Sequence, residues 1–300
     1  MNKGVLYAAG SYTAWGLLPI FWKALHNVPA LEILANRVVW ALVVTLAFGA
    51  ARSNWAWFGT ALRDRRTLLT FGATALLLAV NWGVYIWAVN AGHVVECSLG
   101  YFINPLVNVF LGVTFLRERL RLGQTVAITI ALAGVLYLTV TYGAPPWIAL
   151  VLAGTFGSYG LLRKTAQLNS LEGFTLETVA MFPLALGFLI FTEMTTGGAL
   201  VHAGWGTTLL LASSGVITAV PLLLFASGAR RVTMTTLGLL QYIAPTLQFF
   251  LGVTLYGEKL TTQSLVGFAL VWLALAIYTI EGAVSGGRAS RARTAAAALK

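Results

Sequence analysis

The chain of 300 residues is strongly apolar and sparsely charged, with 58% hydrophobic and 9% charged residues. Because soluble domains carry roughly 25% charged residues, this composition excludes an ordinary soluble fold. The net charge of +10 does not indicate nucleic-acid binding, since the basic residues flank apolar runs instead of clustering on one face. The single cysteine, Cys97, excludes an internal disulfide and a cysteine-based metal site.

Apolar runs bounded by charged, polar, proline or glycine residues predict ten transmembrane helices. In chain order they lie at about 4–25, 30–50, 68–91, 95–116, 122–142, 146–164, 172–192, 204–228, 234–256 and 263–283. The basic segment 284–300 is predicted to be a disordered cytoplasmic tail.

The distribution of basic residues predicts the orientation of these spans. With the N-terminus in the cytoplasm and ten alternating spans, only Lys23 and Lys259 of the 19 Lys and Arg residues fall in outer segments, and Arg37 falls within a span. All others, Arg163 among them, fall in cytoplasmic segments, where positive charge is normally in excess. We therefore expect an all-α, multi-pass protein of the bacterial inner (plasma) membrane with both termini in the cytoplasm.

Residues 103–120 recur as residues 243–260, 140 positions later, with nine of 18 positions identical. A proline, a glycine and a glutamate keep their separations in both copies, which chance similarity between apolar segments does not explain. The offset crosses five helices, an odd number, so the two copies must cross the membrane in opposite directions. The sequence thus predicts a 5+5 inverted-topology repeat with halves at 4–142 and 146–283, an architecture typical of secondary transporters.

Two prolines fall near the middle of equivalent spans, Pro105 in the fourth and Pro245 in the ninth. Each removes a backbone hydrogen bond and is expected to kink its helix. The freed carbonyls are tolerable only where protein or water covers them. A purely structural kink and a place along a transport pathway are both open interpretations.

Five charged residues in or near spans are candidates for a charge network or for ion coupling. A charge at the centre of a span costs at least ~2.5–3.5 kcal/mol on insertion scales, so Arg37 is expected to face the interior. It is predicted to form a local network with Lys23 and Glu32, with a structural ion pair or snorkelling to the interface as alternatives. Glu96 and Glu177 begin the fourth and seventh spans, where a helix-end charge and a coupling residue are both open interpretations.

Aromatic and amide side chains near the middle of several spans predict a substrate cavity. Tyr and Trp at span ends usually form interfacial belts, whereas those beside amides at mid-span suit the walls of a polar-aromatic cavity. The predicted lining residues are Trp15, Asn81, Trp82, Tyr85, Tyr101, Asn104, Tyr159, Gln241 and Tyr242.

Motifs of membrane-embedded enzymes are absent from the sequence. The one aspartate, Asp64, lies in a basic loop, and there is no HExxH pair, Gly-x-Ser-x-Gly elbow or Walker A loop. We therefore expect no catalytic residues, no metal and no cofactor. A transporter is favoured over a passive channel or facilitator, and over a membrane-embedded enzyme.

Several stretches resemble the EamA family of the drug/metabolite transporter superfamily and, within it, the RarD group. The resemblance covers about residues 4–283. Its motifs are Asn81-Trp82, Trp87-Ala88-Val89-Asn90, Ser98-Leu99-Gly100-Tyr101-Phe102-Ile103-Asn104-Pro105, Thr236-Leu237-Gly238, Gln241-Tyr242-Ile243 and Tyr256-Gly257-Glu258-Lys259. It implies an inner-membrane exporter of small metabolites, with spans 1, 3, 4, 6, 8 and 9 around a central cavity.

The sequence therefore predicts a secondary transporter that exports small organic metabolites or amphiphilic drugs by alternating access. Its expected partners are a small-molecule solute and the lipid bilayer, and no nucleic acid. Proton coupling and passive facilitated diffusion are both compatible with the sequence, since no deep, isolated carboxylate is evident. A monomer and a homodimer are likewise both compatible with it.

Overall fold

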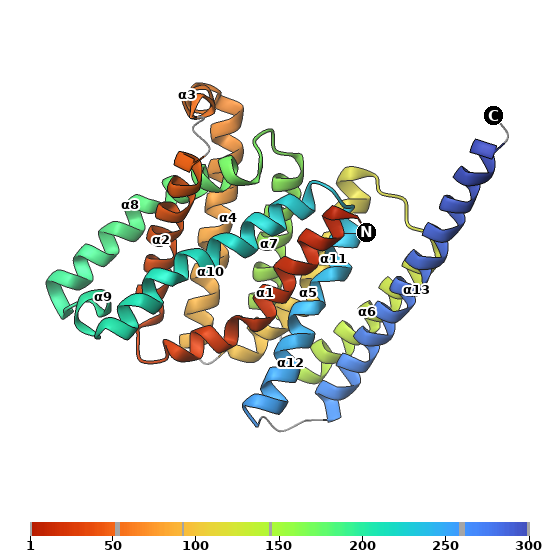
Figure 1. Cartoon of the computed structure of the whole chain (residues 1–300). Coiled ribbons are helices and arrows are strands. Elements are labelled where there is room, and N and C mark those ends of the chain that lie inside the picture. Colours follow the sequence, from red (N-terminus) through yellow and green to blue (C-terminus); the bar gives the residue numbers. More distant parts are fainter. Residues whose placement is uncertain (1, 52–54, 92, 144–145, 258–261, 299–300) are drawn as a thin grey trace.

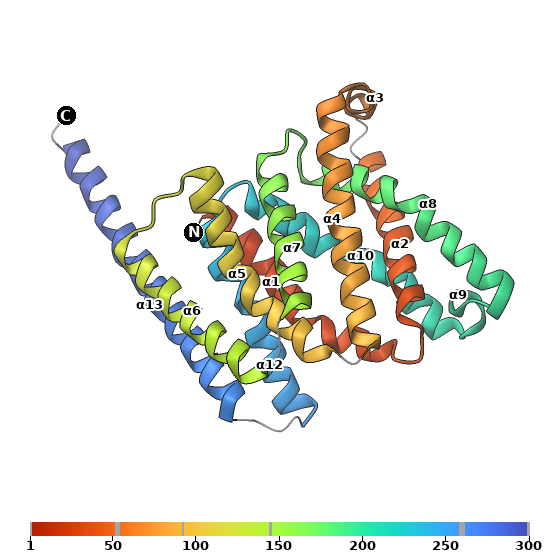
Figure 2. The same ribbon diagram turned by 180° about the vertical axis from the view of Figure 1, so that it is seen from behind.

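The computed structural model of the chain is a helical bundle (Figures 1 and 2). It describes residues 2–51, 55–91, 93–143, 146–257 and 262–298, without the side chains of 90, 94, 95, 142, 263, 264 and 283–298, and these ranges contain no strand. The helices are α1 (Lys3–Ala24), α2 (Ala30–Ala51), α3 (Ala56–Arg63), α4 (Arg65–Asn90), α5 (Val94–Leu116), α6 (Leu122–Tyr142), α7 (Trp147–Thr165), α8 (Ser170–Thr196), α9 (Ala199–His202), α10 (Trp205–Ala229), α11 (Met234–Gln241), α12 (Ile243–Leu255) and α13 (Thr262–Ala298).

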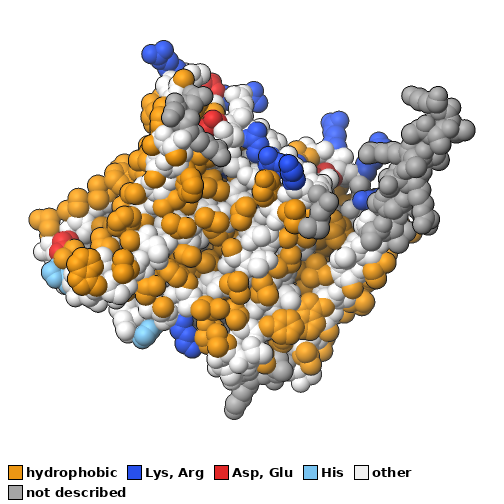
Figure 3. Space-filling model, in the orientation of Figure 1, with side chains coloured by type: hydrophobic (Ala, Val, Ile, Leu, Met, Phe, Trp, Pro, Cys, Tyr) orange, Lys and Arg blue, Asp and Glu red, His pale blue; other side chains and the backbone are white. Residues whose placement is uncertain are grey.

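Eight helical segments of the described chain are long and apolar enough to cross a membrane: α2, α4, α5, α6, α8, α10, the α11–α12 pair and α13. Apolar side chains cover most of the face of the bundle that is seen in Figure 3, and many others are buried inside it. Leu184, Met194 and Trp205, for example, are each more than 80% exposed. A soluble monomer rarely exposes such a continuous apolar surface, whereas a lipid bilayer accommodates it.

The connections that carry the basic residues gather along one edge of the molecule. The N-terminus, the α2–α4 connection with α3, and the α5–α6, α7–α8 and α10–α11 connections all lie at this edge in both ribbon views (Figures 1 and 2). Lys and Arg side chains line the same edge in the space-filling view, while the band below it is apolar (Figure 3). Charge and hydrophobicity are thus layered as a membrane protein requires.

Asp64 shows how a polar residue begins a helix in this chain. Its carboxylate accepts hydrogen bonds from the backbone N–H of Thr67 at 3.1 Å and from the Thr67 hydroxyl at 2.5 Å, and so caps the N-terminus of α4. These bonds, together with the nearby charge of Arg66, hold the pKa of Asp64 below its usual value. The only aspartate of the chain is therefore a helix cap.

Glu118 caps a helix that lies more than 100 residues away in the chain. Arg117 adopts a left-handed conformation, with φ of 54°, and ends α5. The Glu118 carboxylate then accepts hydrogen bonds from the backbone N–H of Met234 at 2.6 Å and of Thr235 at 3.0 Å, at the start of α11. The repeated glutamate thus joins α5 to α11. Its second copy, Glu258, lies outside the described residues.

The centre of the bundle is the close contact between α5 and α11. A Cβ atom on Gly238 would lie 2.5 Å from the backbone oxygen of Pro105, so only glycine allows this approach. The Asn108 amide donates to Gln241 Oε1 at 2.9 Å, and the Tyr242 hydroxyl donates to the carbonyl of Phe102 at 3.2 Å. Side-chain hydrogen bonds of this kind hold transmembrane helices together.

The two mid-span prolines affect their helices differently. α5 continues through Pro105, whereas α11 ends at Gln241 and α12 begins at Ile243, two residues before Pro245. Because proline has no N–H, the carbonyls four residues earlier, those of Tyr101 and Gln241, lose their helical partners.

Helices α1 and α7, both predicted as spans, are not among the eight segments. Two further features differ from the sequence-based expectation. The short helices α3 and α9 lie between predicted spans, and α13 continues as helix to Ala298 through the segment expected to be a disordered tail. Alanine and arginine, which dominate that segment, are among the strongest helix formers.

Replacing Gly238 by alanine should destabilise the protein. The added methyl would overlap the Pro105 carbonyl and separate α5 from α11, so we expect a lower thermal midpoint of the purified protein in detergent. Gly72→Ala is the control, because a Cβ there meets no atom within 4 Å and alanine favours the helix. A Gly238→Ala midpoint equal to that of Gly72→Ala would contradict the close contact.

Candidate functional site

A cavity of about 220 Å³ lies among α1, α2, α4, α5, α7, α10, α11 and α12. The family resemblance implies a central cavity surrounded by spans 1, 3, 4, 6, 8 and 9. The corresponding helices surround this cavity, together with α2. The lining residues are Tyr12, Trp15, Leu18, Pro19, Trp22, Arg37, Asn81, Trp82, Tyr85, Cys97, Ser98, Gly100, Tyr101, Asn104, Leu152, Phe156, Leu222, Gln241, Ala244 and Gln248.

Seven of the nine residues predicted to line a cavity lie around this one. Tyr159 and Tyr242, both fully buried, lie outside the lining. The Tyr242 side chain turns away to bond α5, and Tyr159 lies deeper, against Phe225. Mid-span position correctly locates these two side chains in the interior, but it does not determine the direction in which they point.

The amide side chains of the cavity connect neighbouring helices. The Asn81 amide donates to the carbonyl of Leu152 and to the hydroxyl of Thr155, both at 2.9 Å, and so ties α4 to α7. Asn104 is 4% exposed, and its Oδ1 atom accepts no hydrogen bond in the described structure. The hydroxyl of Tyr12, also buried, likewise has no hydrogen-bond partner there. Buried polar atoms without partners are costly, so these two groups are candidates for contact with a polar solute.

A cluster of aromatic rings lies next to the cavity, on the side of the basic edge. The Trp15 ring lies 5.5 Å from that of Phe156 and 5.6 Å from that of Phe225. The Tyr159 ring stacks on Phe225 at 5.9 Å and lies 5.7 Å from Phe156. These edge, tilted and stacked contacts are favourable ring geometries that fill space densely.

Arg37 contributes a positive charge to the cavity wall. Its Nε atom donates to the hydroxyl of Thr218 on α10 at 3.0 Å. Its guanidinium carbon lies 4.9 Å from the ring centre of Trp22 and 4.7 Å from that of Trp82. Two cation–π contacts and one hydrogen bond therefore orient this side chain.

The predicted network of Lys23, Glu32 and Arg37 does not form. Lys23 Nζ lies 3.8 Å from the ring centre of Tyr256, and Glu32 accepts a hydrogen bond from the backbone N–H of Ala199 at 2.8 Å. The prediction was wrong because five residues of helix separate positions 32 and 37. That separation turns their side chains about 140° apart on α2. Glu96 pairs instead with its helix neighbour His93 at 3.0 Å.

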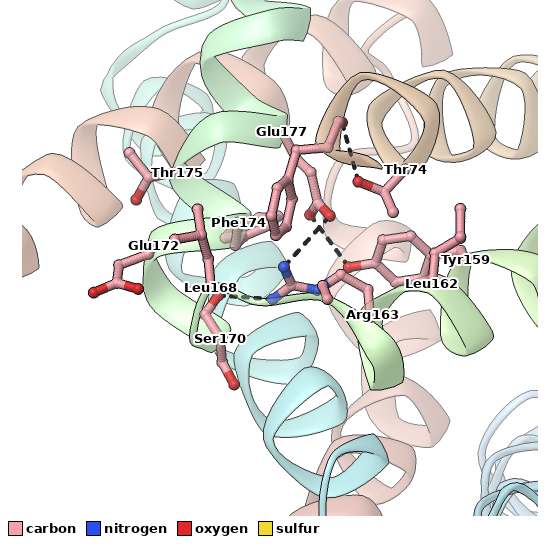
Figure 4. Close-up of polar contacts among 12 residues, drawn as sticks. Thr74, Tyr159, Leu162, Arg163, Leu168, Ser170, Glu172, Phe174, Thr175 and Glu177 are labelled. Carbon is pink, nitrogen blue, oxygen red and sulfur yellow. Dashed lines mark hydrogen bonds and ion pairs between the residues drawn. The ribbon is translucent and has the colours of Figure 1, made fainter. Parts of the chain in front are cut away.

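Glu177 is the buried member of the predicted charged set. It lies inside α8, fully buried, with its carboxylate 3.7 Å from the guanidinium of Arg163 on α7 (Figure 4). The Tyr159 hydroxyl donates to the same carboxylate at 3.3 Å, and Arg163 also donates to the carbonyl of Ser170 at 2.9 Å. The helix-end interpretation of Glu177 is therefore wrong.

The burial of Arg163 is a feature that its position in the sequence did not predict. This residue was assigned to a cytoplasmic segment together with Lys164, yet its side chain is only 1% exposed. Its spacing provides the missed signal, because Tyr159 lies four residues earlier and therefore on the same face of α7. The described residues contain no group of His, Cys, Asp or Glu side chains that could hold a metal ion.

Residues 2–140 and residues 145–280 each match the EamA-like transporter family. The chain belongs to this family. Family membership indicates a membrane transporter, and the eight apolar helices agree with a multi-pass inner-membrane protein. The resemblance expected from the sequence is confirmed.

Relatives of this EamA-like transporter cover nearly the whole chain. Protein RarD of Streptomyces exfoliatus is 48% identical over 99% of this chain and 94% of its own length. The uncharacterized transporter YojE of Bacillus subtilis is 44% identical over 93% of this chain and 94% of its own. Protein RarD of Escherichia coli is 39% identical, over 97% and 98%.

A crystal structure with 21% sequence identity has a TM-score of 0.72 and covers 92% of this chain and 97% of its own. This likeness shows that the fold is shared.

Glu177→Gln should destabilise the protein strongly. It leaves the Arg163 guanidinium buried without its counter-charge, which typically costs about 3–5 kcal/mol. We expect a clear fall in the thermal midpoint of the purified protein. Glu193→Gln is the matched control, because the pair of Glu193 with His202 is half-exposed and contributes little. Equal midpoints for the two variants would show that the buried pair is not a stabilising contact.

Proposed function

We propose that this EamA-like protein is a secondary transporter that moves small organic solutes by alternating access, with the cavity as its solute site. The observation that carries the proposal is the position of the cavity. It is lined by residues from before and after the midpoint of the chain, beside the two prolines. Secondary transporters bind their solutes where interrupted helices of two repeats meet.

The spacing of the helices supports ten spans in a 5+5 inverted repeat. Four pairs of helices begin 140 residues apart, at Ala30 and Ser170, Arg65 and Trp205, Val94 and Met234, and Leu122 and Thr262. α1 and α7 then complete the two halves as their first spans. The helix packing has the same pairwise symmetry. α1 packs on α10 and α12, and α7 packs on their counterparts α4 and α5.

The basic edge supports an orientation with both termini in the cytoplasm. In that orientation the cavity lies toward the outer side, because Trp22 is near the outer end of α1 and Ser98 is in the first turns of α5. The aromatic cluster and the Arg163–Glu177 pair lie between the cavity and the cytoplasm. We therefore interpret this arrangement as the outward-facing state of the transport cycle.

The closed inner side argues against an open channel as the alternative. A channel needs a continuous polar path, whereas the apolar rings of Trp15, Phe156 and Phe225 lie together on the cytoplasmic side of the cavity. We propose export as the direction, from the family resemblance. For proton coupling we propose Glu177, since it lies between two spans whereas Glu32 and Glu96 lie in the first turns of their helices.

Cysteine labelling tests the orientation and the outward-facing cavity. Ser98→Cys, made in a Cys97→Ser background, should react with a membrane-impermeant thiol reagent applied from the periplasmic side, because Ser98 is exposed and lines the cavity. Arg119→Cys, in the exposed α5–α6 connection, should react only from the cytoplasmic side. Labelling of Ser98→Cys from the cytoplasm alone would overturn the proposed arrangement.

A metabolite-efflux screen in proteoliposomes, with and without a pH gradient, tests transport itself. Once it identifies a transported solute, Asn104→Ala should lower the transport rate by about tenfold, which corresponds to the loss of one good hydrogen bond. The folded yield should stay normal, because Asn104 Oδ1 has no partner within the protein to lose. Thr129→Ala, on the exposed face of α6, is the control and should transport normally. Unchanged transport by Asn104→Ala would remove this residue from the solute site.

A further inference from the structure

The described lining of the cavity carries one positive charge and no negative charge. Arg37 is the only Lys or Arg among its lining residues, and within the described chain no Asp or Glu lines it. Arg37 contacts Thr218 and the rings of Trp22 and Trp82, and it interacts electrostatically with the side chains of Tyr85 and Tyr101. None of these neighbours is a carboxylate. Among the described residues, the cavity therefore contains a cation without an acidic counter-charge.

Membrane-embedded charges are normally neutralised, because an unpaired one is costly in a low-dielectric interior. One neutral hydrogen bond and two aromatic faces orient the guanidinium but leave its charge uncompensated. Since Nε is occupied by Thr218, the two terminal amino groups form the edge that is left for another acceptor. That edge has the planar, two-donor geometry that binds a carboxylate through two parallel hydrogen bonds.

In the second half of the chain, the charged residue at the position equivalent to Arg37 has a partner of opposite charge within the protein. The offset of 140 residues places Glu177 opposite Arg37, on helices that begin at Ala30 and Ser170. The Glu177 carboxylate lies 3.7 Å from the Arg163 guanidinium (Figure 4), and the Glu177 side chain is fully buried. Arg37 instead lines an open space. The contrast indicates that the partner of Arg37 comes from outside the protein.

We propose that the cavity binds organic anions, with the carboxylate of the solute paired to Arg37 and its apolar body held among the aromatic rings. This inference rests on the proposed transport function and names the substrate class of the same site. The rings of Trp15, Trp82 and Tyr101 form the apolar part of the wall. The cavity volume of about 220 Å³ lies below the 300–1,000 Å³ of pockets for drug-sized ligands. A small carboxylate therefore fits better than a large amphiphilic drug.

Binding of benzoate to the purified protein, measured by isothermal titration calorimetry, tests the inference without transport. Benzoate combines a carboxylate with an aromatic ring, benzamide is its neutral isostere, and benzylammonium carries the opposite charge. We expect benzoate to bind at least about tenfold more tightly than benzamide, as a charge-assisted pair implies, and benzylammonium not to bind. Equal affinities for benzoate and benzamide, or no benzoate binding at millimolar concentration, would overturn the proposal.

Arg37→Gln should lower benzoate affinity to the level of benzamide and leave benzamide affinity unchanged, which also shows that the cavity is intact. Arg121→Gln is the control, because Arg121 is exposed, pairs with Glu281 and does not line the cavity. Should Arg37→Gln fail to fold, Arg37→Lys keeps the charge without the planar fork and should weaken benzoate binding only partly. Wild-type benzoate affinity in Arg37→Gln, or in Arg37→Lys where Arg37→Gln does not fold, would disprove the role of Arg37.

The two proposals fail in distinguishable ways. If benzoate binds through Arg37 but the vesicles move no solute, the anion site stands and the transport function fails. If a neutral or cationic solute is transported and Arg37→Gln carries it at the normal rate, transport stands and the anion specificity fails.

Discussion

The hydrocarbon core of a bilayer supplies no hydrogen-bond partner, and this constraint decides where the polar groups of the molecule lie. Within the described chain the spans are helical, so their backbone groups bond internally. Their polar side chains bond across helices, as Asn81 does to α7 and Asn108 does to Gln241. Proline relaxes the constraint at two points, where the carbonyls of Tyr101 and Gln241 lose their helical partners. Both residues line the cavity, so the site lies where backbone carbonyls lack their helical hydrogen-bond partners.

From this site toward the basic edge, the interior is arranged in layers of different chemistry. The cavity comes first, then the aromatic rings around Trp15 and Phe225, and then Tyr159, which touches Phe225 on one side and Glu177 on the other. The rings pack against one another, and next to them the buried Arg163–Glu177 pair joins α7 to α8. Breaking such a pair leaves an uncompensated buried charge. Under the proposed alternating access, opening of this side would separate the rings and the charges at once, which favours a two-state change over gradual loosening.

The two halves share helix spacing and differ in charge. Position 37 carries a cation facing an open cavity, while its counterpart at position 177 carries an anion closed against Arg163. Under the proposed transport function, the same backbone position would serve binding in one half and closure in the other. The matching helix spacing supplies the paired positions, and the residues at those positions differ in charge.

Much of this organisation could be predicted from the sequence, because it depends on properties that are local along the chain. The length of apolar runs placed spans within a few residues of α2, α5 and α6. The mid-span position of Asn81, Trp82 and Asn104 was enough to place them near a cavity. The direction in which each side chain points was decided only by the tertiary structure. A transmembrane helix that is apolar on all sides carries almost no signal of which face turns inward. For that reason the burial of Arg163, its pairing with Glu177 and the lack of an acidic partner for Arg37 among the described residues became visible only once the helices were packed.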